Sequence, residues 1–196
     1  MYRQLTPRGV RIPNGFATTA FAYSTFLEET GLDEKIAQVL SGMNVNDVDS
    51  LQHHGLIIRH MILEAPLPDA LSHAIVKAYH QLGSAHHELA DVAVRSSATA
   101  EDLPDASFAG QQETYLNVRG QASLLDACHR CYASLFTDRA ISYRANHGYD
   151  HMQVALSIGI QQMVRSDLAT SGVMFSIDTE SGFRDAVLIN ARESLE

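Results

Sequence analysis

The first 90 positions place apolar residues three or four apart, which is the period of amphipathic helices. Four helices are expected there, and in the first of them Phe21, Phe26 and Leu27 are predicted to share the buried face. The helix boundaries are marked by residues typical of caps and stops: Thr18 or Thr19, Gly31, Asp47, Pro66 and Pro68. This part of the chain contains no catalytic pattern, so it is predicted to form a helical layer.

From Asp91 the pattern changes to short apolar runs separated by turn residues. Val92–Val94 is predicted as a strand that ends at Arg95 and delivers a loop, and Thr114–Val118 as a second strand. Two helices are expected to follow: Ser123–Phe136 and Asp138–Asn146. The last third is predicted as a β-meander of three runs: 154–164, 172–177 and 186–189.

The predicted fold class is therefore α+β (α/β). A mainly helical layer over residues 1–90 precedes an antiparallel or mixed sheet with two helices over residues 91–196. No repeat or flexible linker divides the chain, so it is expected to form one partial domain. The last run would leave a sheet edge uncovered, which folded proteins avoid, and the chain is interpreted as the first part of a longer domain.

The composition is that of an ordinary soluble protein, with 45% hydrophobic and 19% charged residues. The net charge of −9 comes from 14 basic and 23 acidic residues, with no clustered basic face, and this argues against a nucleic-acid partner. No stretch approaches the roughly 18 apolar residues that cross a bilayer, and the polar N-terminus lacks a signal-peptide pattern. We expect a cytoplasmic protein with neither nucleic-acid nor membrane partners.

The two cysteines and ten histidines offer no convincing metal or redox pattern. Cys128 and Cys131 have C-x-x-C spacing, but a structural zinc site needs four ligands and no second pair exists. Both fall inside a predicted amphipathic helix, where core or surface thiols are the favoured interpretation. The histidines show no H-E-x-x-H spacing, so no metal ligand and no catalytic residue is assigned within this chain.

The segment between the first two predicted strands has the features of a phosphate-binding loop. Arg95 offers the planar fork of donors that suits phosphate oxygens. The small residues Ser96, Ser97 and Ala98 after it let a ligand approach the backbone, and Gly110 permits the same on the return. An alternative is that Arg95 forms a structural ion pair with Asp91 or Glu113.

Two blocks give this segment a family resemblance: V-A-V-R-S-S-A-T-A-E-D-L-P over 92–104 and S-F-A-G-Q-Q-E-T over 107–114. They resemble the N-terminal ATP-grasp-type nucleotide domain shared by phosphoenolpyruvate synthase and pyruvate phosphate dikinase, with relatives in rifampin phosphotransferase and the glucan water dikinases. Further blocks resemble the phosphoenolpyruvate synthase branch: 13–19, 135–143, 162–167 and 171–184. The resemblance spans nearly the whole chain and is weakest between Leu32 and Ala90.

The resemblance implies ATP as the ligand and assigns six binding residues: Arg95, Gly110, Thr114, Gln161, Met163 and Val164. By this assignment Arg95 contacts the phosphates, Gly110 belongs to the loop over them, and Thr114 offers a hydroxyl beside them. The strand from Gln161 onward would edge the adenine with backbone groups, with an apolar side chain such as Met163 on the ring face.

The resemblance also implies the reaction of the longer protein, in which ATP, pyruvate and water give AMP, phosphoenolpyruvate and phosphate. A pyrophosphoryl group would pass to a carrier histidine in a downstream domain, and a pyruvate-binding domain would follow. The family's phosphate-binding lysine is expected before Met1, and the ligands of Mg²⁺ after Glu196, so the chain alone should bind ATP weakly and turn nothing over. Two alternatives remain: the nucleotide domain of a related phosphotransferase, such as pyruvate phosphate dikinase or rifampin phosphotransferase, and a catalytically silent binding module.

Overall fold

The computed structural model describes residues 2–83, 89–99, 113–165 and 168–192. The chain divides into two compact units, Met1–Met163 and Val164–Glu196. The elements of the first unit are α1 (Tyr2–Leu5), η1 (Thr6–Arg8), β1 (Gly15–Ala17), α2 (Ala20–Thr30), α3 (Leu32–Ser41), α4 (Val48–Glu64), α5 (Asp69–Gly83), β2 (Val92–Ala98), β3 (Thr114–Val118), α6 (Gln121–Ser134), α7 (Asp138–Asn146) and β4 (Leu156–Gln162). None of the helices in the described ranges is both long and apolar enough to cross a membrane.

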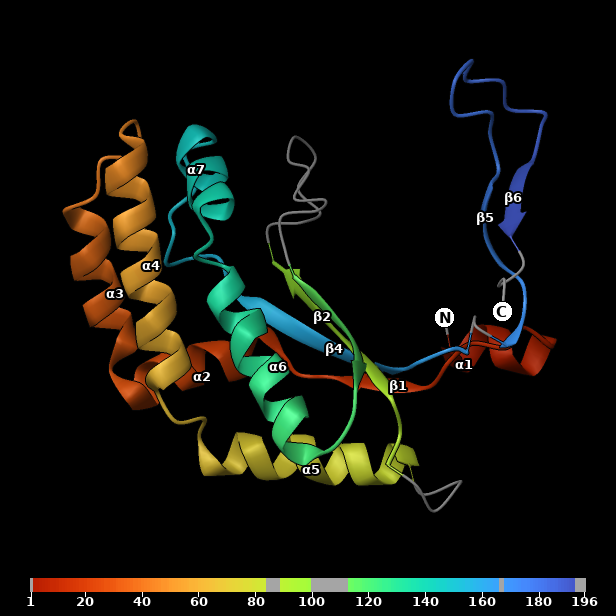
Figure 1. The fold of residues 1–196 in the computed structure, drawn as a ribbon, viewed down its shortest axis with the longest axis horizontal. Helices are drawn as coiled ribbons and strands as arrows, with labels where there is room; N and C mark the ends of the chain where they lie inside the picture. Colours follow the sequence, from red (N-terminus) through yellow and green to blue (C-terminus); the bar gives the residue numbers. More distant parts are fainter. Residues whose placement is uncertain (1, 84–88, 100–112, 166–167, 193–196) are drawn as a thin grey trace. The chain divides into compact units, whose positions relative to one another are not determined.

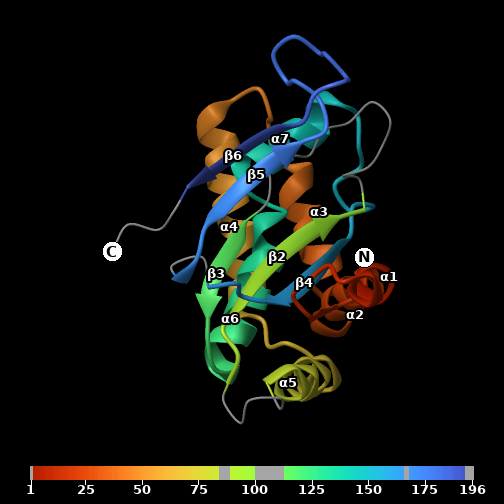
Figure 2. The ribbon, with the colours of Figure 1, turned by 90° about the vertical axis from the view of Figure 1, so that its right-hand side faces the viewer.

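A four-stranded antiparallel sheet organises the first unit, with strand order β1-β4-β2-β3. In β4 the buried Leu156, Ile158 and Ile160 alternate with less buried residues, so one face of the strand meets the core. Helix α6 packs on β2, β3 and β4, and α2 packs on β4. Helices α3 and α4 lie beyond α6 and α2 (Figures 1 and 2). The arrangement confirms the α+β fold class, with helices on one face of the sheet.

The cap residues fix helix α2 at both ends as predicted. The Thr19 hydroxyl accepts a hydrogen bond from the backbone N–H of Ala22 at 3.3 Å, and Gly31 ends the helix with a left-handed φ of 62°. The predicted buried position of Phe21 is wrong, because its side chain is 77% exposed. Five residues separate Phe21 from Phe26, a rotation of about 140° around the helix axis, whereas Tyr23 lies one turn before the buried Phe26.

Helix α5 is joined to the sheet through the hydroxyl of Tyr79, a side chain that is 1% exposed. This hydroxyl donates to the carbonyl oxygen of Ala90 at 2.7 Å and accepts from the N–H of Gly120 at 3.0 Å. The Gln162 side-chain amide adds a hydrogen bond to the carbonyl oxygen of Leu82 at 3.2 Å. These hydrogen bonds join α5 to a residue before the first strand of the pair β2–β3, to the turn after the second, and to the end of β4.

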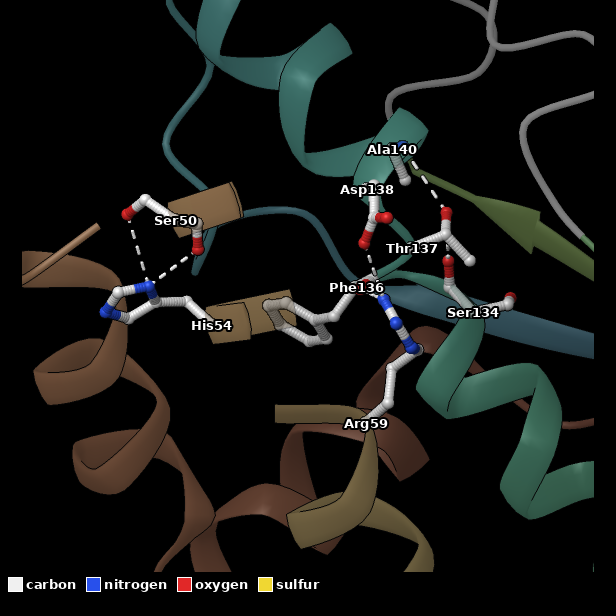
Figure 3. Close-up of polar contacts among 8 residues, drawn as sticks. All are labelled: Ser50, His54, Arg59, Ser134, Phe136, Thr137, Asp138 and Ala140. Carbon is white, nitrogen blue, oxygen red and sulfur yellow. Dashed lines mark hydrogen bonds and ion pairs between the residues drawn. The ribbon is translucent and has the colours of Figure 1, made fainter. Parts of the chain in front are cut away.

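A second polar link joins α4 to the junction of α6 and α7 (Figure 3). The Arg59 guanidinium donates to the carbonyl oxygen of Phe136 at 2.6 Å and to the Asp138 carboxylate at 3.0 Å. Thr137 caps α7 by accepting from the N–H of Ala140 at 3.3 Å. The same view shows His54 bonded within its own helix, through its Nδ1, to the Ser50 carbonyl oxygen at 2.7 Å.

The second unit contains β5 (Ser171–Phe175) and β6 (Leu188–Arg192), which pair antiparallel to one another. Every residue of both strands is exposed. The predicted meander is wrong, because β4 pairs with β1 and β2 instead of β5. The apolar side chains of β4 are buried against α2 and α6, and this burial favours a central place in the first sheet.

Candidate functional site

Arg95 lies in the middle of β2, on the face of the sheet opposite to the helices. The prediction that it leaves the end of a strand is wrong, because β2 continues to Ala98. Val94 and Ala98 are buried on the helix-facing side, whereas Arg95 and Ser97 are exposed on the other. More and less buried positions thus alternate through Ser96 and Ser97, which were predicted to begin a loop.

Two of the predicted binding residues are direct cross-strand partners. Arg95 of β2 pairs with Thr114, the first residue of β3, and on its other side with Gly159 of β4. Gly159 in turn pairs with Ala17 of β1. Because directly opposed residues share a face, these four positions form a row across the outer face of the sheet, with Arg95 as its only long side chain.

Gln161 lies on the same outer face, two residues along β4 from Gly159. It pairs with Ala93 and with Gly15, and its side-chain amide donates to the carbonyl oxygen of Pro13 at 3.3 Å. The structure therefore brings together Arg95, Thr114 and Gln161 on one surface.

The remaining predicted residues are distributed differently. Met163 follows β4, and its backbone N–H donates to the carbonyl oxygen of Asp91 at 2.8 Å, so this group is engaged inside the protein. Val164 is 65% exposed and begins the second unit. Gly110 lies outside the described residues.

The alternative structural role for Arg95 finds no support in the described ranges. There the Arg95 side chain forms no ion pair with Asp91 or Glu113, and Asp91 instead lies 3.9 Å from the guanidinium of Arg119. In a chain with a net charge of −9, an exposed guanidinium beside a hydroxyl offers a local positive site for an anionic ligand.

The C-x-x-C segment contributes to the core. Cys128 and Cys131 are both fully buried in α6, and burial raises the pKa of the Cys128 thiol to about 12 and raises that of Cys131 as well. Thiols protonated at neutral pH are poor nucleophiles and poor metal ligands. Across the part of the chain that the structure describes, no group of three or more His, Cys, Asp or Glu residues is arranged to hold a metal ion.

A cavity of about 400 Å³ lies elsewhere, and its lining includes Arg59, Tyr115, Arg130 and Asp138. None of the predicted binding residues that the structure describes lines it. Its two cations are already engaged, since Arg59 pairs with Asp138 at 3.0 Å and Arg130 pairs with Asp126 at 2.9 Å. Tyr115 is the β3 residue opposite the buried Val94, which places this cavity on the helix side of the sheet.

A buried cation lies in α7. The Arg144 side chain is 0% exposed, its Nε donates to His151 Nδ1 at 3.0 Å, and its guanidinium lies 5.4 Å from the Phe136 ring centre. Burial lowers the pKa of Arg144 to about 10, although the neighbouring Tyr23 raises it. Burial, and then the Arg144 charge, lowers the pKa of His151. The accepting Nδ1 requires His151 to be neutral in the folded protein.

Residues of β4 and β1 that share the outer face of the sheet with Arg95 were missed in the sequence-based prediction. Ser157 and Gly159 were included in an apolar run, although apolar and small or polar residues alternate from Leu156 to Gln161. That period of two was the available signal. Its partner strand β1 was also missed, because three residues, Gly15–Ala17, are too few to show a period.

Comparisons with known proteins agree with the resemblance. The family model described as pyruvate phosphate dikinase, AMP/ATP-binding domain, matches residues 1–194. A protein of Synechocystis sp. named phosphoenolpyruvate synthase is 56% identical over 200 residues, which cover 100% of this chain and 24% of the relative. The protein of that name from Escherichia coli is 56% identical over 191 residues (97% of this chain, 24% of the relative). The one from Aquifex aeolicus is 53% identical over 196 residues (100% and 23%). The chain thus spans about a quarter of the length of these relatives.

Proposed function

Since the chain belongs to the pyruvate phosphate dikinase AMP/ATP-binding domain family, we propose that it forms part of the ATP-binding domain of a phosphoenolpyruvate synthase. The identity of 53–56% to proteins of that name supports the choice within the family. The proposed reaction of the whole protein converts ATP, pyruvate and water into AMP, phosphoenolpyruvate and phosphate. Its proposed partners are downstream phospho-histidine and pyruvate-binding domains of the same polypeptide.

The observation on which the proposal rests is the place of Arg95 on the face of the sheet opposite to the helices. Arg95 is an exposed residue, and its cross-strand partners Thr114 and Gly159 carry a small side chain and none, respectively. A planar guanidinium can donate two parallel hydrogen bonds to phosphate oxygens, and the Thr114 hydroxyl can donate a third. Phosphoryl transfer depends mainly on such positioning and on neutralising charge, so binding and orienting the phosphates is the task proposed for these residues.

The base would lie toward the end of β4. The Gln161 side-chain amide is on the same face as Arg95, and Met163 follows it with an apolar side chain suited to an adenine ring. Val164 and Gly110 complete the proposed set. Mg²⁺ would supply further positive charge at the phosphate oxygens when bound with ATP, through ligands proposed to lie outside this chain.

The test is Arg95→Met in the full-length protein, which keeps a long side chain and removes the charge. Losing a hydrogen bond to a charged group costs about 1.5–3 kcal/mol, so kcat/KM for ATP should fall roughly 10- to 100-fold. AMP formation in the presence of pyruvate is the readout, measured beside the control Arg130→Met. Arg130 is also a half-exposed surface arginine, but its partner is Asp126 and it lies on the helix side of the sheet.

The control should retain activity within about twofold, since exposed ion pairs contribute little. Unchanged ATP turnover in Arg95→Met would refute the site. AMP formation that depends on an acceptor other than pyruvate would identify a related phosphotransferase. ATP binding without any turnover by the full-length protein would identify a binding module.

A further inference from the structure

Gly159 occupies a position in the middle of β4 where the fold itself does not require glycine. Its backbone is not in the left-handed region that favours glycine. Among the residues that the structure describes, a Cβ added there would meet only the Arg95 carbonyl oxygen, at 3.8 Å, which is an ordinary van der Waals contact. Within the described part of the chain, the space above its Cα is therefore open.

Gly15, on the same face in β1, is a useful contrast. A Cβ at Gly15 would overlap the carbonyl oxygen of Ile160, so close approach of two strands explains that glycine. No described segment approaches Gly159 as closely. Glycine inside a strand weakens it, because the chain loses more conformational freedom on folding and has no side chain to pack. A glycine without a folding reason in a strand interior often marks the place where a ligand approaches the backbone.

The neighbours of Gly159 identify what that ligand would contact. Arg95 is its cross-strand partner on β2, and Thr114 is the next position in the same row, on β3. Adjacent strands are about 4.8 Å apart, so a group resting on Gly159 lies within reach of the Arg95 side chain. The space is thus bordered by a charged donor and lies above the bare backbone of Gly159.

We propose that Gly159 is a positioning residue of the nucleotide site, whose missing side chain leaves the surface beside Arg95 to the bound nucleotide. This inference rests on the proposed function. It adds a steric requirement that is separate from the charge of Arg95: the phosphate-bearing part of the nucleotide lies against the backbone of β4. A side chain at position 159 would occupy the same space and push the ligand away from the guanidinium.

The experiment compares Gly159→Ala and Gly159→Val with the wild-type chain and with Arg95→Met. Backbone amide NMR spectra of the 196-residue chain are titrated with Mg-ATP, a method that detects weak as well as tight binding. Thermal unfolding is recorded for each variant. The dissociation constant should rise about 10-fold in Gly159→Val and two- to threefold in Gly159→Ala, whereas the unfolding midpoint should stay the same or rise, because valine favours strands.

The outcomes separate this inference from the function on which it rests. Binding that Arg95→Met weakens and Gly159→Val leaves unchanged would overturn the role of Gly159 alone. A lower unfolding midpoint in Gly159→Ala would also overturn it, since the fold would then need the glycine. No ATP-dependent shift in the wild-type chain would overturn both the proposed function and this inference.

Discussion

The hydroxyl of Tyr79 provides a direct test of what joins the helical layer to the sheet. Tyr79→Phe removes one oxygen atom and leaves the buried ring in place. Two groups then lose their partner: the Ala90 carbonyl, 2.7 Å from the hydroxyl, and the Gly120 N–H, 3.0 Å from it. Ala90 lies 11 residues after Tyr79 in the sequence, just before β2. Gly120 lies 41 residues after it, between β3 and α6.

The expected cost follows from the burial of these groups. A buried polar group left without its hydrogen bond costs about 1–3 kcal/mol. Ala90 and Gly120 are half-buried, so water can reach them in part and the lower end of that range applies to each. We therefore expect Tyr79→Phe to lower the free energy of unfolding by about 2 kcal/mol.

Tyr132→Phe is the matched control, because it makes the same chemical change at a side chain that is 0% exposed. Within the described ranges its hydroxyl has no hydrogen-bond partner; the Thr18 hydroxyl lies near it without meeting hydrogen-bond geometry. Urea denaturation followed by far-UV circular dichroism gives both free energies. The control should change by less than about 0.5 kcal/mol, since no bond is lost. Equal losses in the two variants would refute the argument that the Tyr79 hydrogen bonds stabilise the fold.

Two further predictions concern the first unit. Gly15→Ala should lower the free energy of unfolding by about 2 kcal/mol, because its Cβ would overlap the Ile160 carbonyl oxygen; thermal unfolding beside Gly159→Ala checks this, and equal stability of the two variants would contradict it. The lowered pKa of His151 means that the unfolded chain takes up a proton below pH ~6.5 while the folded chain resists it. Stability should therefore fall with pH from about 6.5 down to the folded pKa, and less steeply in His151→Gln, which keeps an acceptor for Arg144 but cannot titrate; parallel pH profiles would count against the titration of the buried His151 as the cause.

Local features of the fold were readable because they depend on residues close together in the chain. The Thr19 cap, the Gly31 stop and the full extent of α7 from Asp138 to Asn146 follow from cap chemistry and helical period. The burial of Phe26 follows from the same period. Phe21 was placed wrongly because apolar character was counted without the angle that five residues subtend around a helix.

The site depended on long-range pairing, which no local pattern specifies. Arg95 was recognised from the residues around it, but its place in the interior of a strand depends on pairing with β4, more than 60 positions later. The same register places Gly159 and Gln161 on the face of Arg95. Sequence reasoning therefore identified residues that could bind phosphate without identifying the surface on which they lie. The row across β3, β2, β4 and β1 turns separate candidates into one surface.

Gly55 in helix α4 is a second residue whose role depends on a contact far away in the sequence. A glycine in a helix interior costs about 1 kcal/mol relative to alanine, and α4 contains one at a buried position. The structure supplies the reason across the interface: a Cβ at Gly55 would lie 3.0 Å from the Asp138 carboxylate and 3.3 Å from the Ile141 side chain. The missing side chain lets α7 approach α4 closely enough for Asp138 to pair with Arg59. At Gly55 and Gly15 the opposing element needs the space, whereas at Gly159 the opposing element leaves it open, and that difference is the physical ground for assigning the space to a ligand.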